Sequence, residues 1–297
     1  MRPLRNLTLI GLVATLAVAG CGVAEQPQVL QVLEQTSSTP PSPTTAPADG
    51  SPTVQAAPEQ RAAELPDADE IVAAVRSVLG SARVGVLVVD RDTGADLVAV
   101  EAERQFRSAS LVKLMIAVDV LADGPTAATR KRISAMLTAS DDDIATSLWV
   151  RQGGTDLLTR STRRMGLTGT EPPAIVGRWG DVLLTARDVA KVYDYVLDEL
   201  PADDRALIVD SLAASTPTAA DGFDQTFGIP SGISAEWAVK QGWSDSTNDI
   251  VVHSTGLVGD HWRYMVVLLT EYPLGTRWAN ARKAVTAGAA VLDPYLS

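Results

Sequence analysis

Three short motifs place serines, lysines and acids at spacings that could support acyl transfer. Ser110 and Lys113 stand at positions i and i+3, so on a helix the hydroxyl and the amine share one face. A serine at a helix start lies in the positive field of free backbone N–H groups, which favours a developing oxyanion. Burial of Lys113 would lower its pKa and supply a neutral amine as general base. Alone, the motif also fits a helix cap followed by a lysine that reaches solvent.

The second and third motifs add polar groups of the same kind. Ser140-Asp141-Asp142 precedes an expected helix over Ile144–Arg151, where serine and aspartate are also ordinary N-cap and first-turn residues. Lys240-Gln241-Gly242 falls on an expected strand, where a lysine is usually solvated and a glycine often marks a bulge. Neither motif indicates catalysis without the other two.

The elements that must position these motifs are strands at both ends of a domain and helices between them. Helical spacing covers 67–79, 110–122, much of 130–212, and 277–292. A β-hairpin is expected from 84–90 and 97–100 around Asp92-Thr93-Gly94. Further strands are expected over Trp237–Trp243, Asp249–Ser254 and Trp262–Thr270, with turns at Ser246–Asn248 and Gly256–Asp260. This order predicts an α+β fold in which an antiparallel sheet is flanked by helices and carries an inserted helical subdomain.

Taken together, the motifs resemble those of the penicillin-recognising serine hydrolases. Class A β-lactamases and penicillin-binding proteins carry Ser-x-x-Lys, Ser-Asp-Asn and Lys-Thr-Gly in this order. The flanking segments Glu103–Ser110, Met165–Thr168, Thr185–Ala190 and Thr247–Ile250 also resemble that family. The resemblance runs from about Asp67 to the C-terminus. The sequence is also similar to an actinobacterial group of lipoproteins that carry Ser-Asp-Asp and Lys-Gln-Gly-Trp at these places. The resemblance implies a β-lactamase/transpeptidase-like fold with a trimmed helical subdomain.

The resemblance implies a role for each catalytic position. Ser110 would be the acylated nucleophile, and Lys113 would take its proton. Ser140 would relay a proton to the leaving nitrogen, and Lys240 would lend positive potential to Ser140 and to a substrate carboxylate. The backbone N–H groups of Ser110 and Trp243 would form the oxyanion hole.

The substrate-binding positions implied by the resemblance are Asp142, Lys240, Gln241, Gly242 and Trp243, and three of them depart from the family pattern. Asp142 replaces an amide with a carboxylate. Gln241 replaces a hydroxyl residue that holds a substrate carboxylate. Trp243 replaces a small residue on the same strand face as Gln241, and its indole could narrow the groove, stack on a sugar or acyl chain, or pack in the core.

A base to activate the deacylating water is not evident. Glu171 and Asp181 are the acids between Gly166 and Leu184; Glu171 is early for the family's glutamate, and Asp181 fits an ordinary loop aspartate. A Ser-His-Asp triad has little support, because His253 and His261 fall on or beside late strands and Gly-x-Ser-x-Gly is absent from the sequence.

The composition excludes several other classes of function. The formal net charge is −11, and an acidic chain lacks the basic face that nucleic acid requires. One cysteine and two histidines allow no disulfide framework and argue against a metal centre built from Cys or His ligands. We therefore expect no cofactor, no metal and no nucleic-acid partner.

The N-terminus resembles a bacterial lipoprotein signal. Arg2 and Arg5 precede an apolar stretch over Leu7–Ala19, which ends at the lipobox-like Val18-Ala19-Gly20-Cys21. This implies a signal peptide over residues 1–20 and a mature chain that begins at a diacylated Cys21, since two or more acyl chains anchor stably. The alternative is a signal-anchor helix over Leu7–Ala24.

A flexible spacer is expected between the anchor and the domain. Residues 21–66 are rich in Pro, Ser, Thr and Ala, a composition that cannot bury enough apolar surface to fold. Residues 67–297 remain as the β-lactamase-like domain, which we expect to be monomeric and anchored at the outer face of the cytoplasmic membrane in the cell envelope.

Two functions follow from these observations. The first is an exported, lipid-anchored serine hydrolase that acts on β-lactams or acyl-D-Ala-D-Ala peptidoglycan stems through acylation of Ser110, with poor deacylation. The alternative is a catalytically degenerate lipoprotein with a binding or structural role in the envelope, which the changes at Asp142, Gln241 and Trp243 favour.

Overall fold

The structure is a computed structural model that describes residues 67–296. The predictions of a signal peptide, of lipidation at Cys21 and of a linker to residue 66 lie outside the described residues. Within the described part of the chain, no helix is both long and apolar enough to cross a membrane.

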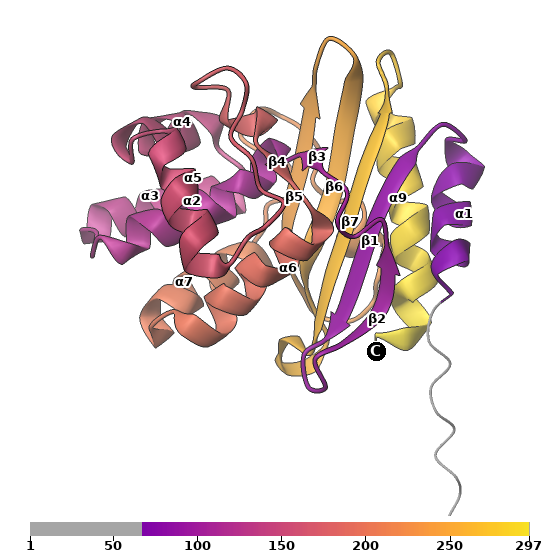
Figure 1. Ribbon diagram of the computed structural model, residues 1–297. Coiled ribbons are helices and arrows are strands. Elements are labelled where there is room, and N and C mark those ends of the chain that lie inside the picture. Colours follow the sequence, from indigo (N-terminus) through magenta and orange to yellow (C-terminus); the bar gives the residue numbers. More distant parts are fainter. Residues whose placement is uncertain (1–66, 297) are drawn as a thin grey trace, which may run out of the picture. The chain divides into compact units, whose positions relative to one another are not determined.

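A five-stranded antiparallel sheet joins the two ends of the domain (Figure 1). The strand order is β2-β1-β7-β6-β5, so the N-terminal hairpin pairs with the C-terminal strands through Val88 and Val266. The predicted α+β fold with an antiparallel sheet is confirmed. The strands are β1 Arg83–Asp90, β2 Ala95–Val100, β5 Trp237–Asp245, β6 Asp249–Val258 and β7 Tyr264–Pro273.

Helices cover both faces of this sheet (Figure 1). On one face, α1 and α9 pack over a core that includes Val86 and Val88 of β1, whereas Leu87 and Val89 belong to the core on the helical-subdomain face. Burial on both faces explains the continuous apolar run of β1. The helices are α1 Ala68–Val78, α2 Val112–Ala122, α3 Ala127–Thr138, α4 Asp142–Arg151, α5 Thr155–Met165, α6 Ala186–Asp194, α7 Ala202–Ala213, α8 Ile229–Gly232 and α9 Trp278–Leu292.

Helix α2 is buried on every side and carries the first motif into the core. Every residue from Val112 to Leu121 is buried, as expected for a helix without a polar face. Its second charge, Asp119, accepts hydrogen bonds from the guanidinium of Arg160 at 3.0 and 2.6 Å. Ser110 lies just before α2, in the short helix η1 Ala109–Leu111.

Two sequence-based boundaries are wrong. Gly256 was expected in a turn, but β6 continues through it to Val258. A Cβ at Gly256 would lie 2.5 Å from the Ala238 carbonyl oxygen, so the glycine is there because strand β5 approaches closely. Strand β7 begins at Tyr264 rather than Trp262, because His261 and Trp262 adopt left-handed backbone angles.

We predict that Gly256→Ala destabilises the fold by about 1–3 kcal/mol, because the added methyl group must push β5 away from β6. Urea unfolding measures the change. Gly80→Ala is the matched control, since its Cβ would meet nothing closer than 3.9 Å. Equal stability of the two variants would show that the β5–β6 contact is not tight.

Candidate active site

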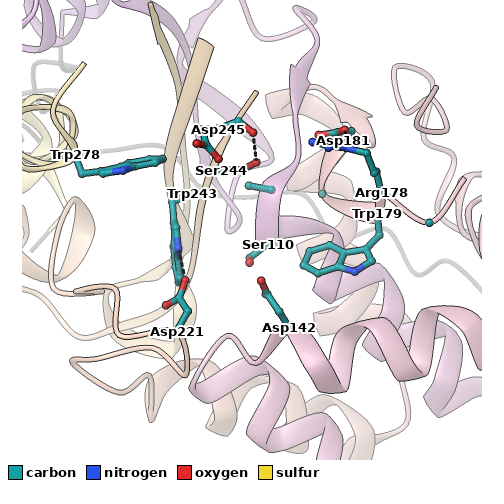
Figure 2. Close-up of a pocket in the computed structure, with 13 residues that line it drawn as sticks. Ser110, Asp142, Arg178, Trp179, Asp181, Asp221, Trp243, Ser244, Asp245 and Trp278 are labelled. Carbon is teal, nitrogen blue, oxygen red and sulfur yellow. Dashed lines mark hydrogen bonds and ion pairs between the residues drawn. The ribbon is translucent and has the colours of Figure 1, made fainter. Parts of the chain in front are cut away.

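Ser110 lies at the floor of a pocket of about 350 Å³. It is 4% exposed, and the preceding residue, Ala109, has a left-handed backbone with φ of 45°. Such a conformation in a residue with a Cβ is strained and is common beside functional groups. Figure 2 shows Ser110 between two walls, one carrying Trp243 and Asp221 and the other carrying Trp179.

Lys113 connects Ser110 to the second motif. Its Nζ donates to Ser110 Oγ at 2.9 Å and to Ser140 Oγ at 3.1 Å. The same amine contacts the Ser140 carbonyl at 2.6 Å and Asp142 Oδ1 at 2.5 Å. The structure thus brings Ser110, Lys113, Ser140 and Asp142 into one cluster.

The environment of Lys113 favours release of its proton. Burial lowers the pKa of Lys113 below its usual value, while the charge of Asp142 acts in the opposite direction. The side chain of Lys113 is fully buried, whereas that of Asp142 is 60% exposed to the pocket. Solvent therefore weakens the Coulombic effect of the carboxylate more than it weakens the desolvation of the amine.

Lys240 approaches the same serine from the sheet. Its Nζ donates to Ser140 Oγ at 2.9 Å and to the Gln241 carbonyl at 2.8 Å. Burial, followed by the nearby charge of Lys113, holds the pKa of Lys240 well below its usual range. Ser140 Oγ can accept from both amines and still has its own proton to donate.

Ser140 is held in place by its backbone. Its φ is 52°, in the left-handed region, and its carbonyl receives the 2.6 Å hydrogen bond from Lys113. Asp141 then caps α4, because its carboxylate accepts from the N–H of Ile144 at 2.9 Å. The N-cap expected from the sequence is thus supplied by Asp141, which leaves Ser140 for the two lysines and Asp142 for the pocket.

Gln241 and Gly242 do not line the pocket, although both were expected at the substrate-binding strand. Gln241 is buried, and its Nε2 donates to the carbonyls of Gln225 and Phe227 at 3.0 and 2.6 Å. A Cβ on Gly242 would lie 3.2 Å from Ser108 O. Gln241 therefore holds the segment from Gln225 to Phe227 against β5. Gly242 lets β5 lie close to the segment that carries Ser110.

Trp243 forms a wall of the pocket rather than part of the core. It is half-buried and lines the pocket. Its ring stacks on Phe223, with centroids 4.6 Å apart and planes 5° apart, and its Nε1 donates to Asp221 Oδ2 at 2.9 Å. Of the three expectations for Trp243, core packing does not fit this placement.

Trp179 is a pocket residue that sequence reasoning missed. Its ring centroid lies 5.0 Å from Lys113 Nζ, and its Nε1 donates to Thr146 Oγ1 at 3.1 Å. It lies in an irregular loop within the short helix η2 Trp179–Asp181, where no periodic pattern identifies it. The sequence signal that could have drawn attention to it is an aromatic residue in a Gly-rich stretch.

Neither loop acid is placed as a free base. Glu171 is exposed, does not line the pocket, and pairs through its backbone with Leu183. Asp181 lines the pocket, but its carboxylate is ion-paired with Arg107 and Arg178. Neither of the two acids that the sequence offers in this loop is therefore free to act as a base beside Ser110.

His253 has a structural role. It is fully buried, and its Nδ1 accepts from the Thr270 N–H at 3.1 Å. Its Nε2 therefore carries the proton and donates to the Arg107 carbonyl at 2.8 Å. Burial lowers the pKa of His253 to about 4, so the ring is neutral at physiological pH. Across residues 67–296, no group of three or more His, Cys, Asp or Glu side chains could hold a metal ion.

Comparisons with known proteins agree with this geometry. A family model described as "Beta-lactamase enzyme family" matches residues 68–126. A Mycobacterium tuberculosis protein named "Putative lipoprotein LppW" is 35% identical over 99% of this chain and 98% of its own length.

Solved structures show the same fold. The β-lactamase of Streptomyces albus G has a TM-score of 0.62 and 20% identity, covering 77% of this chain and 99% of that one. The L158E mutant of PBP-A, an acyl-enzyme complex with penicillin G, has a TM-score of 0.61 and 18% identity, covering 77% and 96%. At these identities the likeness concerns the fold alone.

We predict that Asp142→Asn accelerates acylation of Ser110 at neutral pH. Removing the carboxylate removes a charge that raises the pKa of Lys113, and each unit of decrease gives about tenfold more neutral amine. The acid limb of the pH–rate profile should move to lower pH, and Asp143→Asn, an exposed acid in the same helical turn, should not move it. A faster rate with an unmoved limb would instead assign the effect of Asp142 to substrate binding.

Proposed function

The chain belongs to the family of LppW and has the β-lactamase/transpeptidase-like fold, and on this basis we propose that it is an exported, lipid-anchored serine hydrolase. Ser110 accepts an acyl group from an amide or ester of the cell envelope. β-Lactams and acyl-D-Ala-D-Ala stems are the substrates that the family resemblance offers.

The observation that carries this proposal is the continuous contact of Ser110 Oγ, Lys113 Nζ, Ser140 Oγ and Lys240 Nζ, at 2.9, 3.1 and 2.9 Å. The neutral amine of Lys113 takes the Ser110 proton as Oγ attacks the carbonyl carbon. As the bond to the leaving nitrogen or oxygen breaks, Ser140 donates its proton to that atom and recovers one from Lys113. Protons balance over the step, and the acyl group remains on Ser110.

The anchor completes the proposal. The lipobox-like sequence ending at Cys21 and the lipoprotein name of the related LppW support export and acylation of the mature N-terminus. An anchored domain would meet envelope substrates at the outer face of the cytoplasmic membrane.

One observation favours the alternative of an envelope binding protein without turnover. Asp142 contacts Lys113 at 2.5 Å, and a paired carboxylate stabilises the charged amine, which cannot take a proton. In that case the pocket would bind a ligand without acylation of Ser110.

Intact-mass measurement separates the two functions. We predict that the wild-type protein gains one acyl group after hours with millimolar penicillin or with a neutral activated ester, and that Ser110→Ala gains none. Ser147→Ala, at an exposed serine of α4, should react like the wild type. A wild-type mass unchanged by both reagents would establish the binding-protein alternative.

We further predict that the acyl group persists once formed. Glu171 lies outside the pocket and Asp181 is ion-paired with two arginines, so neither acid of this loop is free to activate water beside Ser110. A chromogenic β-lactam should give at most a stoichiometric burst, and Glu171→Gln should leave the decay of the adduct unchanged. Rapid turnover that Glu171→Gln abolishes would contradict this assignment.

A further inference from the structure

The charges and aromatic rings of the pocket point to a particular class of acyl donor. We propose that the site selects substrates that present a cationic group, such as an ammonium, to the wall formed by Asp221, Trp243 and Asp245. This inference rests on the proposed function, because it concerns the donor that acylates Ser110.

The first observation is that this wall carries negative charge with no cation in direct contact among the described residues. Asp221 and Asp245 both line the pocket, and the charges that act on them do so at longer range: Lys113 and Lys240 on Asp221, and Arg178 on Asp245. The carboxylate of Asp221 receives a hydrogen bond from Trp243 Nε1, which leaves its charge in place. In contrast, Asp142 and Asp181 are paired with cations.

The second observation is that the positive charges near the pocket are already engaged. The side chains of Lys113 and Lys240 are buried, and their amines are bound to Ser140. Arg178, a lining residue on the opposite wall, is ion-paired with Asp181. The surface that a ligand meets is therefore negative, which repels anions and attracts cations.

The third observation is an aromatic surface between the two acids. Figure 2 shows Trp243 on the wall between Asp221 and Asp245. One face of its indole is covered by Phe223, and Lys240 Nζ lies 5.9 Å from the ring centroid, at the outer limit of a cation–π contact; the indole also lines the pocket. A cation on an indole face gains about 0.5–2 kcal/mol. The adjacent carboxylates add Coulombic attraction, so both interactions favour a positively charged group.

The position that would hold a substrate carboxylate has been lost. Gln241 replaces the hydroxyl expected there, and its amide is bound to the backbone of Gln225 and Phe227. An anionic donor would thus have Arg178 as its partner and would face Asp221 and Asp245. We expect a donor such as a peptide with a free amine, or an aminoacyl ester, to react faster than a donor with a carboxylate at the same distance from its carbonyl.

A matched series of thioesters tests this inference. The three reagents share one carbonyl and one leaving thiol and carry a trimethylammonium, a tert-butyl or a carboxylate group. We expect the second-order rate of Ser110 acylation, measured by intact mass, to fall in that order, with about tenfold or more between cation and neutral isostere. Salt should reduce the difference.

Variants assign the preference to the wall. Asp221→Asn keeps an oxygen that can accept from Trp243 and removes the charge; with Asp245→Asn it should abolish most of the preference for the cation. Asp143→Asn, which removes one negative charge outside the pocket and so matches the single Asp221→Asn variant, should retain the preference. Equal rates for the three thioesters, or the fastest rate for the carboxylate, would overturn the inference while leaving acylation of Ser110 intact.

A binding measurement separates this inference from the proposed function. Quenching of tryptophan fluorescence in Ser110→Ala is followed with unreactive amide analogues of the same three compounds. Tighter binding of the cationic amide supports the inference even if no thioester acylates the wild type, an outcome that would defeat the hydrolase proposal alone. No preference for the cationic amide would overturn the inference.

Discussion

Two buried lysine amines share one serine hydroxyl, and the architecture of the site depends on this contact. Lys113 comes from α2, Lys240 from β5 and Ser140 from the turn before α4, so the contact joins the helical subdomain to the sheet. Burial lowers the pKa of both lysines, and the charge of Lys113 lowers the pKa of Lys240 further, because two adjacent buried ammonium groups are costly. The site therefore relieves an unfavourable charge by releasing a proton, which is the property a general base needs.

Arg107 provides the corresponding constraint at the other side of the pocket. It extends from β3 Phe106–Arg107 and is 13% exposed. Its guanidinium donates to Asp249 of β6 at 3.1 Å and to Ser244 of β5 at 2.9 Å, and it pairs with Asp181 of the loop at 3.4 Å. One side chain thus ties together β3, which precedes Ser110, the strands β5 and β6 of the sheet, and the short helix η2 that carries Trp179. Because these contacts are charge-assisted, they hold the walls more firmly than neutral hydrogen bonds would.

The sequence predicted the reacting cluster better than its surroundings, and the reason is physical. One helical turn brings Ser110 and Lys113 together, and strand alternation directs Lys240 and Gln241 to opposite faces of β5. Both placements depend only on neighbouring residues, so the sequence predicts them. The partners of Gln241 come from Gln225 and Phe227, in a loop whose path depends on tertiary packing. Gly256 was misjudged for the same reason, since the carbonyl of Ala238 that excludes a side chain is distant in sequence.

The lysines of this cluster support the fold as well as the proposed chemistry. Replacing Lys113 would leave the Ser140 carbonyl and the Asp142 carboxylate without their partner, and loss of a buried partner costs about 1–3 kcal/mol or more. Ser110 differs, because its hydroxyl receives one of several hydrogen bonds that Lys113 donates, so the other contacts of the amine remain when Ser110 is replaced. The proposed acyl transfer is thus separable from the architecture of the site at one oxygen atom, the Oγ of Ser110.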